Sequence, residues 1–351
     1  NSKMNSTHFS TTSDKSTKTT SVSDLSNIYK VLDHRDHVIQ KSDTYLGSKD
    51  EQIEEQYVLH KSIVTNDTDT SDKDTQYQII QKEITYIPAM YKLFDELLVN
   101  AADHIERLNG IIKKGTSNIK PVTKIWVTIT KDHIIVKNNG TGIDIAPIPE
   151  QDNKYPPEII FGTLLSSSNF NDEEERIIGG KNGYGAKLAN IFSNLFKVTT
   201  VDNIRKLIYY QSYFNNMTVT GDPVINKYTK EPYTEIEFHQ DFSQFGTITE
   251  YSPDIISLFK KRVYDIAMWT GSKVKVYLND ELIKINSLLG FTNLNEPLRN
   301  KVKVCEKLGE RWEIVVTSSD DDVFKHISYV NSINTYHGGK HVDYLVDTIG
   351  K

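Results

Sequence analysis

The sequence predicts an α+β fold with a mostly antiparallel sheet, on the strength of two observations. Helical and strand-like patterns follow one another in a mixed order, without the regular strand–helix–strand repeat of a doubly wound nucleotide-binding fold. Two pairs of strand-like segments are joined by tight polar turns, Lys-Asp and Asn-Asp, as antiparallel neighbours are. At 351 residues, the chain is long enough for about two domains.

Composition narrows the class of protein. The net charge of −6 argues against a basic surface over the whole chain, so any nucleic-acid contact is expected to be local. Cys305 is the single cysteine, which excludes a disulfide framework and a cysteine-built zinc site and favours a reducing compartment. Since there is no long apolar run and no N-terminal apolar signal region, neither a membrane span nor secretion is expected.

The N-terminal third predicts a tail, a loop and one long helix. Residues 1–26 are rich in Ser and Thr and predict a disordered tail, and the polar stretch 65–76 predicts an exposed loop or hairpin tip. Residues 85–107 carry apolar side chains with a 3.6-residue period, which predicts one amphipathic helix; these are Met90, Phe94, Leu97, Leu98, Ala101 and Ile105.

The remaining elements alternate between the two types. Strands are predicted over 122–130 and 133–142, a helix begins at the prolines of 156–170, and another helix covers 185–196. Three strand-like segments follow, namely FKVTTVD, KLIYYQSYF and YTEIEFH. Beyond residue 246 the patterns predict a helix (ISLFKKRVYDIAMW), a hairpin (KVKVYLNDELIKI) and two strands (RWEIVVTSS and HISYVNSINTY).

A glycine-rich stretch, IIGGKNGYGAK at 177–187, suggests a phosphate-binding loop but fits neither common template. A Walker A loop starting at Gly180 would need lysine where Ala186 stands, and a dinucleotide-binding loop starting at Gly183 would need glycine where Leu188 stands. Taken alone, the stretch is equally consistent with a flexible surface turn.

Three polar groups accompany this loop. Glu96, Asn100, Asp103 and His104 form one stripe on the helix 85–107. A solvated helix face is the ordinary reading of such a stripe, but Asn100 is a poor helix former that could ligate Mg²⁺, and a carboxylate one turn earlier could activate a water.

The other two groups follow a strand and a helix. In KNNGTGI (137–143), Gly140 and Gly142 would let the backbone approach a ligand, and the amide of Asn139 matches the edge of adenine. A plain turn is the alternative there. The third group, SSSN at 166–169, would by itself be a helix cap or a loop.

The order of these motifs resembles a known family. FDELLVNAADH, NNGTGI, FGTLLSSSNF and GGKNGYGAKLANIF occur in this order in the ATPase region of eukaryotic-type type II DNA topoisomerases, within the gyrase, heat-shock chaperone, histidine kinase and MutL superfamily. The resemblance covers about residues 28–351. LDHRDHVIQKSDTYLGS is similar to the family's N-terminal arm, and RVYDIAMW and YVNSINTYHGGKHVDY are similar to its transducer domain.

This resemblance implies a specific architecture. The expected fold is a two-layer α/β sandwich of the Bergerat ATPase type followed by a transducer domain. The expected divisions are a tail at 1–26, an ATPase domain with its arm at 27–245 and a C-terminally incomplete transducer at 246–351.

The resemblance also implies ATP and Mg²⁺ as ligands and a role for each matching residue. Glu96 would be the general base, Asn100 the Mg²⁺ ligand and Asn139 the adenine reader, while His104 stands at a nucleotide contact that is often Asn. Tyr45 would reach the nucleotide of the partner subunit. Ribose and phosphates would be contacted by Ser167, Ser168 and Asn169, and the lid would comprise Gly180, Lys181, Asn182, Gly183, Tyr184, Gly185, Ala186 and Lys187.

The implied function is that of an ATP-hydrolysing isomerase, a type II DNA topoisomerase, of which this chain carries the N-terminal gate. ATP-driven closure of a homodimer with exchanged arms would capture double-stranded DNA, in the nucleus or at a site of viral DNA replication. The family's Gln-Thr-Lys loop is not recognisable before Lys351, and neither is its DNA-cleaving region. A chaperone-like or mismatch-repair-like ATPase clamp is the alternative, and a domain that binds ATP without hydrolysing it is a third possibility.

Overall fold

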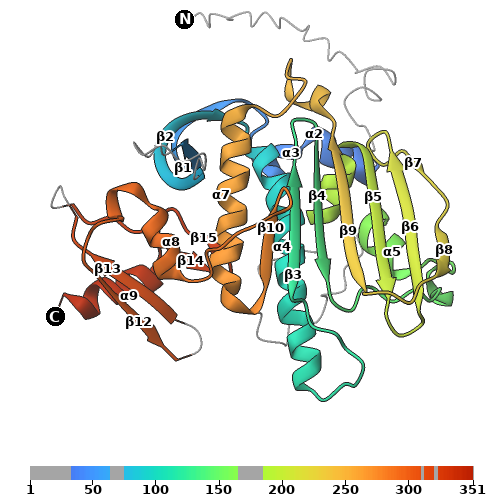
Figure 1. Ribbon diagram of the computed structural model, residues 1–351. Coiled ribbons are helices and arrows are strands. Elements are labelled where there is room, and N and C mark those ends of the chain that lie inside the picture. The colour runs from blue at the N-terminus through green and yellow to red at the C-terminus, as the bar shows by residue number, and fades with distance from the viewer. Residues whose placement is uncertain (1–32, 64–74, 165–184, 310–311, 320–322, 351) are drawn as a thin grey trace, which may run out of the picture.

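The computed structural model describes residues 33–63, 75–164, 185–309, 312–319 and 323–350 (Figure 1). The predicted tail 1–26 and most of the predicted loop 65–76 lie outside these ranges. Within them, the α+β class and the mostly antiparallel sheet are confirmed. No helix in the part of the chain that the structure describes is long and apolar enough to cross a membrane.

A nine-stranded sheet forms the centre of the molecule, in the order β11-β10-β3-β4-β9-β5-β6-β7, with β8 also paired to β6. β10 pairs with β3 in parallel, and the neighbouring β3–β4 and β4–β9 pairs are antiparallel. The strands are β3 Lys124–Ile129, β4 His133–Asn139, β5 Ser193–Asp202, β6 Leu207–Phe214, β7 Val219–Thr220, β8 Val224–Lys227, β9 Tyr233–Gln240, β10 Lys275–Leu278 and β11 Glu281–Leu282.

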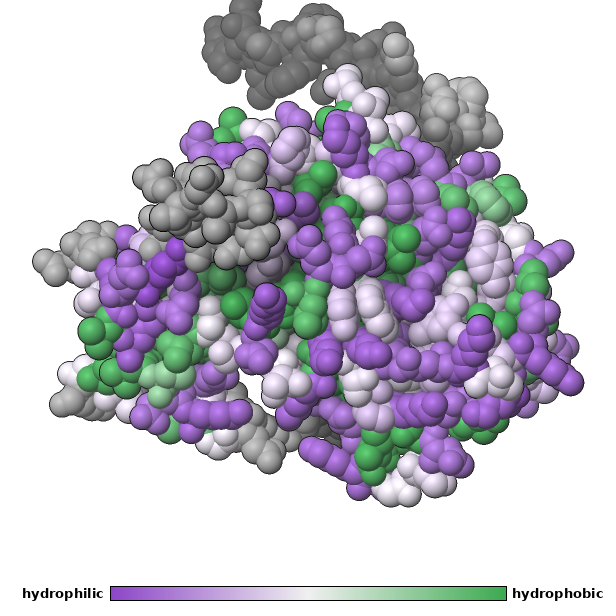
Figure 2. Space-filling model, viewed as in Figure 1, coloured by the Kyte–Doolittle hydropathy of each residue, from purple (hydrophilic) through white to green (hydrophobic). Residues whose placement is uncertain are grey.

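Helices cover one face of this sheet (Figure 1). They are α4 Pro88–Lys113, α5 Pro156–Gly162, α6 Gly185–Ile191 and α7 Pro253–Thr270. Buried and half-buried residues alternate along β3 and β4, as expected where one sheet face is packed and the other is open. Figure 2 shows mostly hydrophilic side chains over the open face.

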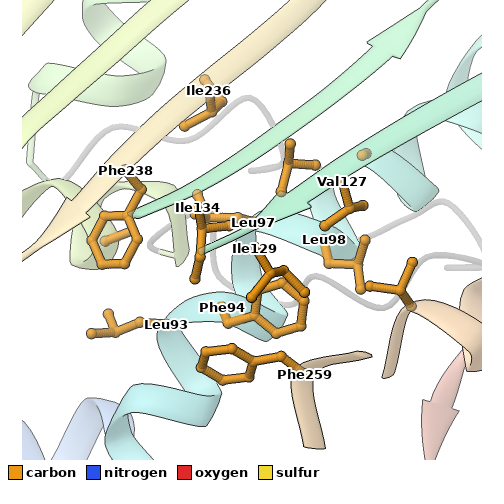
Figure 3. Close-up of a cluster of buried hydrophobic side chains, with 14 of the residues drawn as sticks. Leu93, Phe94, Leu97, Leu98, Val127, Ile129, Ile134, Ile236, Phe238 and Phe259 are labelled. Carbon is orange, nitrogen blue, oxygen red and sulfur yellow. The ribbon is translucent and has the colours of Figure 1, made fainter. Parts of the chain in front are cut away.

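The core lies between α4, α7 and the sheet (Figure 3). Phe94 of α4 and Phe259 of α7 stack with their ring centroids 4.4 Å apart, and Ile134 of β4 is fully buried beside them. Because burying an apolar side chain of this size contributes about 1.5–3 kcal/mol, this contact helps to hold the two helices together.

The N-terminal elements lie before α4. They are α2 His34–Gln40, α3 Ser42–Leu46 and a hairpin of two long strands, β1 Gln52–Ile63 and β2 Thr75–Tyr86. The predicted helix start at residue 85 is therefore wrong, because β2 continues to Tyr86 and α4 begins at Pro88, where proline suits the first turn. The helix also runs six residues past its predicted end at 107.

Residues 288–350 form a C-terminal unit of small elements. These are α8 Leu288–Leu294, the hairpin of β12 Lys303–Leu308 and β13 Trp312–Thr317, the hairpin of β14 Tyr329–Val330 and β15 Ile333–Asn334, and α9 Lys340–Ile349. The segment predicted as one strand around 329 instead reverses at Asn331 and Ser332, both with positive φ. Single-turn 3₁₀ helices are η1 Pro149–Gln151, η2 Phe242–Phe245, η3 Gly271–Lys273 and η4 Glu296–Leu298.

One predicted helix end changes. The helix predicted over 185–196 ends at Ile191, because residues from Ser193 pair with β6 and β9. The domain division at 245/246 stays a prediction. Beyond it, α7 packs on α4 and β10 pairs with β3, and the buried core continues to Ile283 and to Phe291 of α8.

Candidate functional site

Glu96 lies on α4 directly against the first residue of α6. Its side chain is 19 % exposed, and a Cβ built on Gly185 would lie 1.8 Å from its Oε2 atom. Any larger residue at this position would force the carboxylate to move. The structure thus brings the predicted base together with the end of the glycine-rich stretch, 89 positions away in the chain.

Lys92, one turn before Glu96, holds the other carboxylate oxygen. Its Nζ lies 2.5 Å from Oε1, and the carboxylate raises the pKa of Lys92 against the opposing effect of burial. Lys92 was not predicted from the sequence, although the i,i+4 spacing of the two charges on one helix face indicates such a pair.

Asn100 follows Glu96 by one turn and is exposed. Among the described residues, no group of three or more His, Cys, Asp or Glu side chains could hold a metal ion. An exposed amide oxygen beside a carboxylate fits Mg²⁺ nonetheless, because this ion often takes one or two protein ligands and completes its shell with waters and substrate phosphates.

Asn139 was predicted to recognise adenine, but its side-chain amide hydrogen-bonds to other residues of the protein. Its Oδ1 accepts hydrogen bonds from the backbone N–H groups of Thr123 and Lys124, both at 2.8 Å. Its Nδ2 donates to Thr123 Oγ1 and to Glu231 Oε1, both at 2.9 Å. All four sites of the amide are used, so the structure contradicts the adenine role for Asn139 and gives it the task of holding the start of β3.

Asn138, one position earlier, lies on the other face of the sheet. It pairs with Ile125, which is fully buried under the helices, while Asn139 pairs with Tyr233 on the open side. Asn138 donates one hydrogen bond, from Nδ2 to the carbonyl of Asn139 at 3.0 Å. The period of two along β4 was the signal that could have distinguished these neighbours.

His104 is a buried residue that fastens the loop after β4. Its Nε2 donates to the Thr141 carbonyl at 2.7 Å, and its Nδ1 accepts from the Arg107 guanidinium at 2.6 Å. Burial, with the Arg107 charge as the second cause, lowers the pKa of His104 to about 3. The imidazole is therefore neutral at physiological pH.

The two glycines of this loop are explained by the protein itself. A Cβ on Gly142 would lie 2.4 Å from the Val201 carbonyl oxygen of β5, and Gly140 has a φ of +101°. Both features serve the close packing of the loop, so they give no independent sign of a ligand.

Lys187, in the first turn of α6, is 1 % exposed. Burial lowers the pKa of its ammonium to about 8. A negative charge next to a buried ammonium favours its charged form, so Lys187 is suited to contact a phosphate. Ala186 beside it is also buried.

The other predicted site residues are placed as follows. Tyr45 lies on α3, half-buried, with its hydroxyl 3.4 Å from His37 Nδ1. Ser167, Ser168, Asn169 and the lid residues Gly180, Lys181, Asn182, Gly183 and Tyr184 lie outside the described residues. The structure thus places Glu96 and Asn100 on α4 and Gly185 and Lys187 on α6, two helices that pack together, and brings Glu96 against Gly185.

Comparison with known proteins gives consistent results. No protein-family model matches the chain. It is 39 % identical over 325 residues to the DNA topoisomerase 2 of Acanthamoeba polyphaga mimivirus, covering 92 % of this chain and 24 % of the relative. It is also 39 % identical over 328 residues to the probable DNA topoisomerase 2 of Dictyostelium discoideum, covering 93 % and 20 %. The chain thus spans about a quarter or less of these relatives.

Solved structures match over most of their length. The ATPase region of Saccharomyces cerevisiae topoisomerase II superimposes with a TM-score of 0.76 at 37 % identity, covering 93 % of this chain and 79 % of that one. The ATPase and transducer domains of DNA topoisomerase II from Balamuthia mandrillaris give a TM-score of 0.77 at 36 % identity, covering 92 % and 76 %. The chain therefore belongs to the family formed by the ATPase regions of eukaryotic-type type II DNA topoisomerases.

Proposed function

We propose that this chain binds and hydrolyses ATP, with Glu96 as the general base. The observation that carries the proposal is the contact between Glu96 Oε2 and Gly185, which sets a carboxylate against the end of the glycine-rich stretch and close in sequence to the buried Lys187. A base and a cation suited to phosphate then lie on two helices that pack together.

The residues divide the chemistry between them. Glu96 accepts the proton of the water that attacks the γ-phosphate, and Lys92 fixes the carboxylate through Oε1. Lys187, in the first turn of α6, supplies positive charge to the triphosphate. Asn100 would hold Mg²⁺, which supplies charge neutralisation to the phosphates when bound.

Adenine recognition is assigned to Asn138 in place of Asn139. Asn138 lies on the helix side of the sheet, as Glu96 does. Among the described residues its amide makes one hydrogen bond, to the Asn139 carbonyl, whereas the Asn139 amide makes four. An amide offers both a donor and an acceptor to the base edge. Ser167, Ser168, Asn169 and the residues from Gly180 to Tyr184 keep their proposed nucleotide contacts on the resemblance alone.

On the wider scale, the chain is proposed to act as the N-terminal gate of a type II DNA topoisomerase. Its relatives carry that name and extend far beyond the matched region. ATP would close a homodimer with exchanged arms around double-stranded DNA, with Tyr45 reaching the partner's nucleotide, in the nucleus or at a site of viral DNA replication. No feature of the described residues favours a chaperone-like or mismatch-repair-like clamp over this assignment.

Calorimetric titration of the 351-residue chain with ATP, with and without Mg²⁺, tests the proposal. We expect Mg²⁺ to tighten binding to the wild type and to have little effect on Asn100→Ala, because the amide ligand is gone. Asn109→Ala, on the same helix, is the matched control and keeps the Mg²⁺ effect. An unchanged Mg²⁺ effect in Asn100→Ala would remove this residue from the metal site, and no binding by the wild type would refute the function.

A further inference from the structure

A buried ion pair joins α4 to α7 immediately beside the proposed base. Arg262 of α7 donates from Nε to Asp95 Oδ1 at 2.7 Å, and the two residues are 2 % and 8 % exposed. Asp95 directly precedes Glu96 on α4. The proposed mechanism gives this pair no role.

A second buried cluster extends from the same turn of α7 to the C-terminal unit. Lys261 donates to Asp265 Oδ2 at 3.0 Å, and the hydroxyl of Tyr329 donates to Asp265 Oδ1 at 2.9 Å. Lys261 and Asp265 are 2 % and 1 % exposed. Tyr329 belongs to β14 and packs edge-on against Phe291 of α8. The cluster is therefore a polar connection between α7 and residues 288–350.

These charges are poorly explained by stability alone. A buried ion pair loses its hydration, and apolar residues of similar volume are often as stable or more so. The terminal nitrogens of Arg262, Nη1 and Nη2, are also buried and make no hydrogen bond within the part of the chain that the structure describes. An apolar contact was available here, since Phe94 and Phe259 already pack the same two helices together.

An ion pair differs from an apolar contact in being directional. Apolar surfaces slide past one another at small cost, whereas a 2.7 Å bond between Nε and Oδ1 fixes both the rotation and the height of one helix against the other. A shift of α7 would therefore move Asp95, and with it Glu96, which has close contacts with Gly185 and Lys92.

We propose that Asp95 and Arg262, together with Lys261, Asp265 and Tyr329, form a relay through which the C-terminal unit positions Glu96. These five are positioning residues; none of them touches the reacting atoms. Movement of residues 288–350 then changes the rate of the chemical step without changing the contacts to the nucleotide. The proposal rests on the proposed function, in which Glu96 is the base.

Tyr329→Phe tests the relay with the loss of one hydroxyl, while the ring keeps its contact with Phe291. We expect kcat for ATP hydrolysis to fall about tenfold with KM within about twofold, because a displaced base lowers the rate and leaves nucleotide binding intact. Tyr344→Phe, at an exposed position of the same unit, is the control and keeps the wild-type kcat. A wild-type kcat in Tyr329→Phe would overturn the relay.

Hydrogen exchange gives a readout that needs no hydrolysis. In Tyr329→Phe we expect faster exchange in α4 around residues 93–100 and unchanged exchange in β5 and β6, which lie outside the relay. Unchanged exchange in α4 would contradict the proposal even if the chain were inactive. This separates the two ideas: a wild-type chain without turnover refutes the function, whereas turnover that survives Tyr329→Phe refutes the relay.

The double variant Asp95→Leu/Arg262→Met distinguishes a loss of positioning from unfolding of the chain. Apolar replacements fill the space without charge, so we expect a melting temperature at or above that of the wild type together with a reduced kcat. A double variant that is folded and fully active would show that the pair does not position Glu96.

Discussion

At the scale of single residues, Lys187 carries the clearest pH signature. Burial lowers the pKa of its ammonium to about 8, so part of it is deprotonated in the free chain above that pH. A bound triphosphate favours the charged form and raises this pKa again. ATP binding should therefore take up a proton at about pH 8.5 and take up none at about pH 6.5, where the ammonium is already charged.

Calorimetry in buffers of different ionisation enthalpy measures this uptake. Lys187→Met should abolish it, and weaker ATP binding should accompany the loss of charge. If the variant takes up the same fraction of a proton as the wild type, another group is responsible and Lys187 does not face the phosphates.

A substitution at Gly185 tests its contact with Glu96, on which the proposed site depends. In Gly185→Ala the new Cβ would fall 1.8 Å from Glu96 Oε2, so the carboxylate must move and ATP turnover should drop at least about tenfold. Gly110→Ala is the control, because no atom lies within 4 Å of its added Cβ and alanine stabilises a helix interior by about 0.5–1 kcal/mol. Equal turnover in the two variants would disprove the packing of α6 against Glu96.

At the scale of elements, the two neighbouring asparagines at the end of β4, Asn138 and Asn139, face opposite sides of the sheet. Asn139→Ala removes three hydrogen bonds at the start of β3 and one to Glu231. It should cost about 1–3 kcal/mol in unfolding free energy, with nucleotide affinity unchanged. Asn138→Ala should weaken ATP binding about tenfold at a smaller cost in stability. Thermal melts and titrations of both variants decide this, and the reverse pattern would restore Asn139 as the adenine reader.

Element types could be predicted from the sequence where periodicity is strong. The apolar period of α4 and the tight turn between β3 and β4 were sufficient, and the Asn279–Asp280 turn of the β10–β11 hairpin appears as expected, with positive φ at both residues. Helix ends were not predictable to the residue, since the local pattern around 185–196 stays apolar where the chain passes from α6 into β5. Pairing with β6 and β9 decides that boundary.

The sequence allowed the residue types of the site to be predicted, but not the directions in which their side chains point. The stripe on α4 located Glu96 and Asn100, but which of two neighbouring asparagines faces the helices depends on the register of β4 against β3. His104 shows the same limit, because a polar position on a helix stripe does not reveal that Arg107 and the Thr141 carbonyl already occupy the ring. Lys92 was overlooked because an i,i+4 ion pair is a common surface feature.

At the scale of the whole molecule, we expect the first folding unit to include α7 and β10. Residues Ile255, Phe259 and Val263 of α7 are buried in the main core, and β10 completes the sheet beside β3. A fragment of residues 27–286 should therefore unfold cooperatively, whereas a fragment of residues 27–246 should be largely unfolded, because it exposes the apolar faces of α4 and β1. Circular dichroism melts compare the two, and a cooperative melt of the shorter fragment would support the boundary near 246.

Glu96→Ala removes the proposed base of ATP hydrolysis and tests the proposed function most directly. Steady-state hydrolysis and ATP binding are measured on the wild type and on this variant. We expect the variant to bind ATP with an affinity close to that of the wild type and to turn it over at least about a hundredfold more slowly, since general-base catalysis contributes about 10²–10⁴-fold. Turnover at the wild-type rate in Glu96→Ala would contradict the proposed role of Glu96.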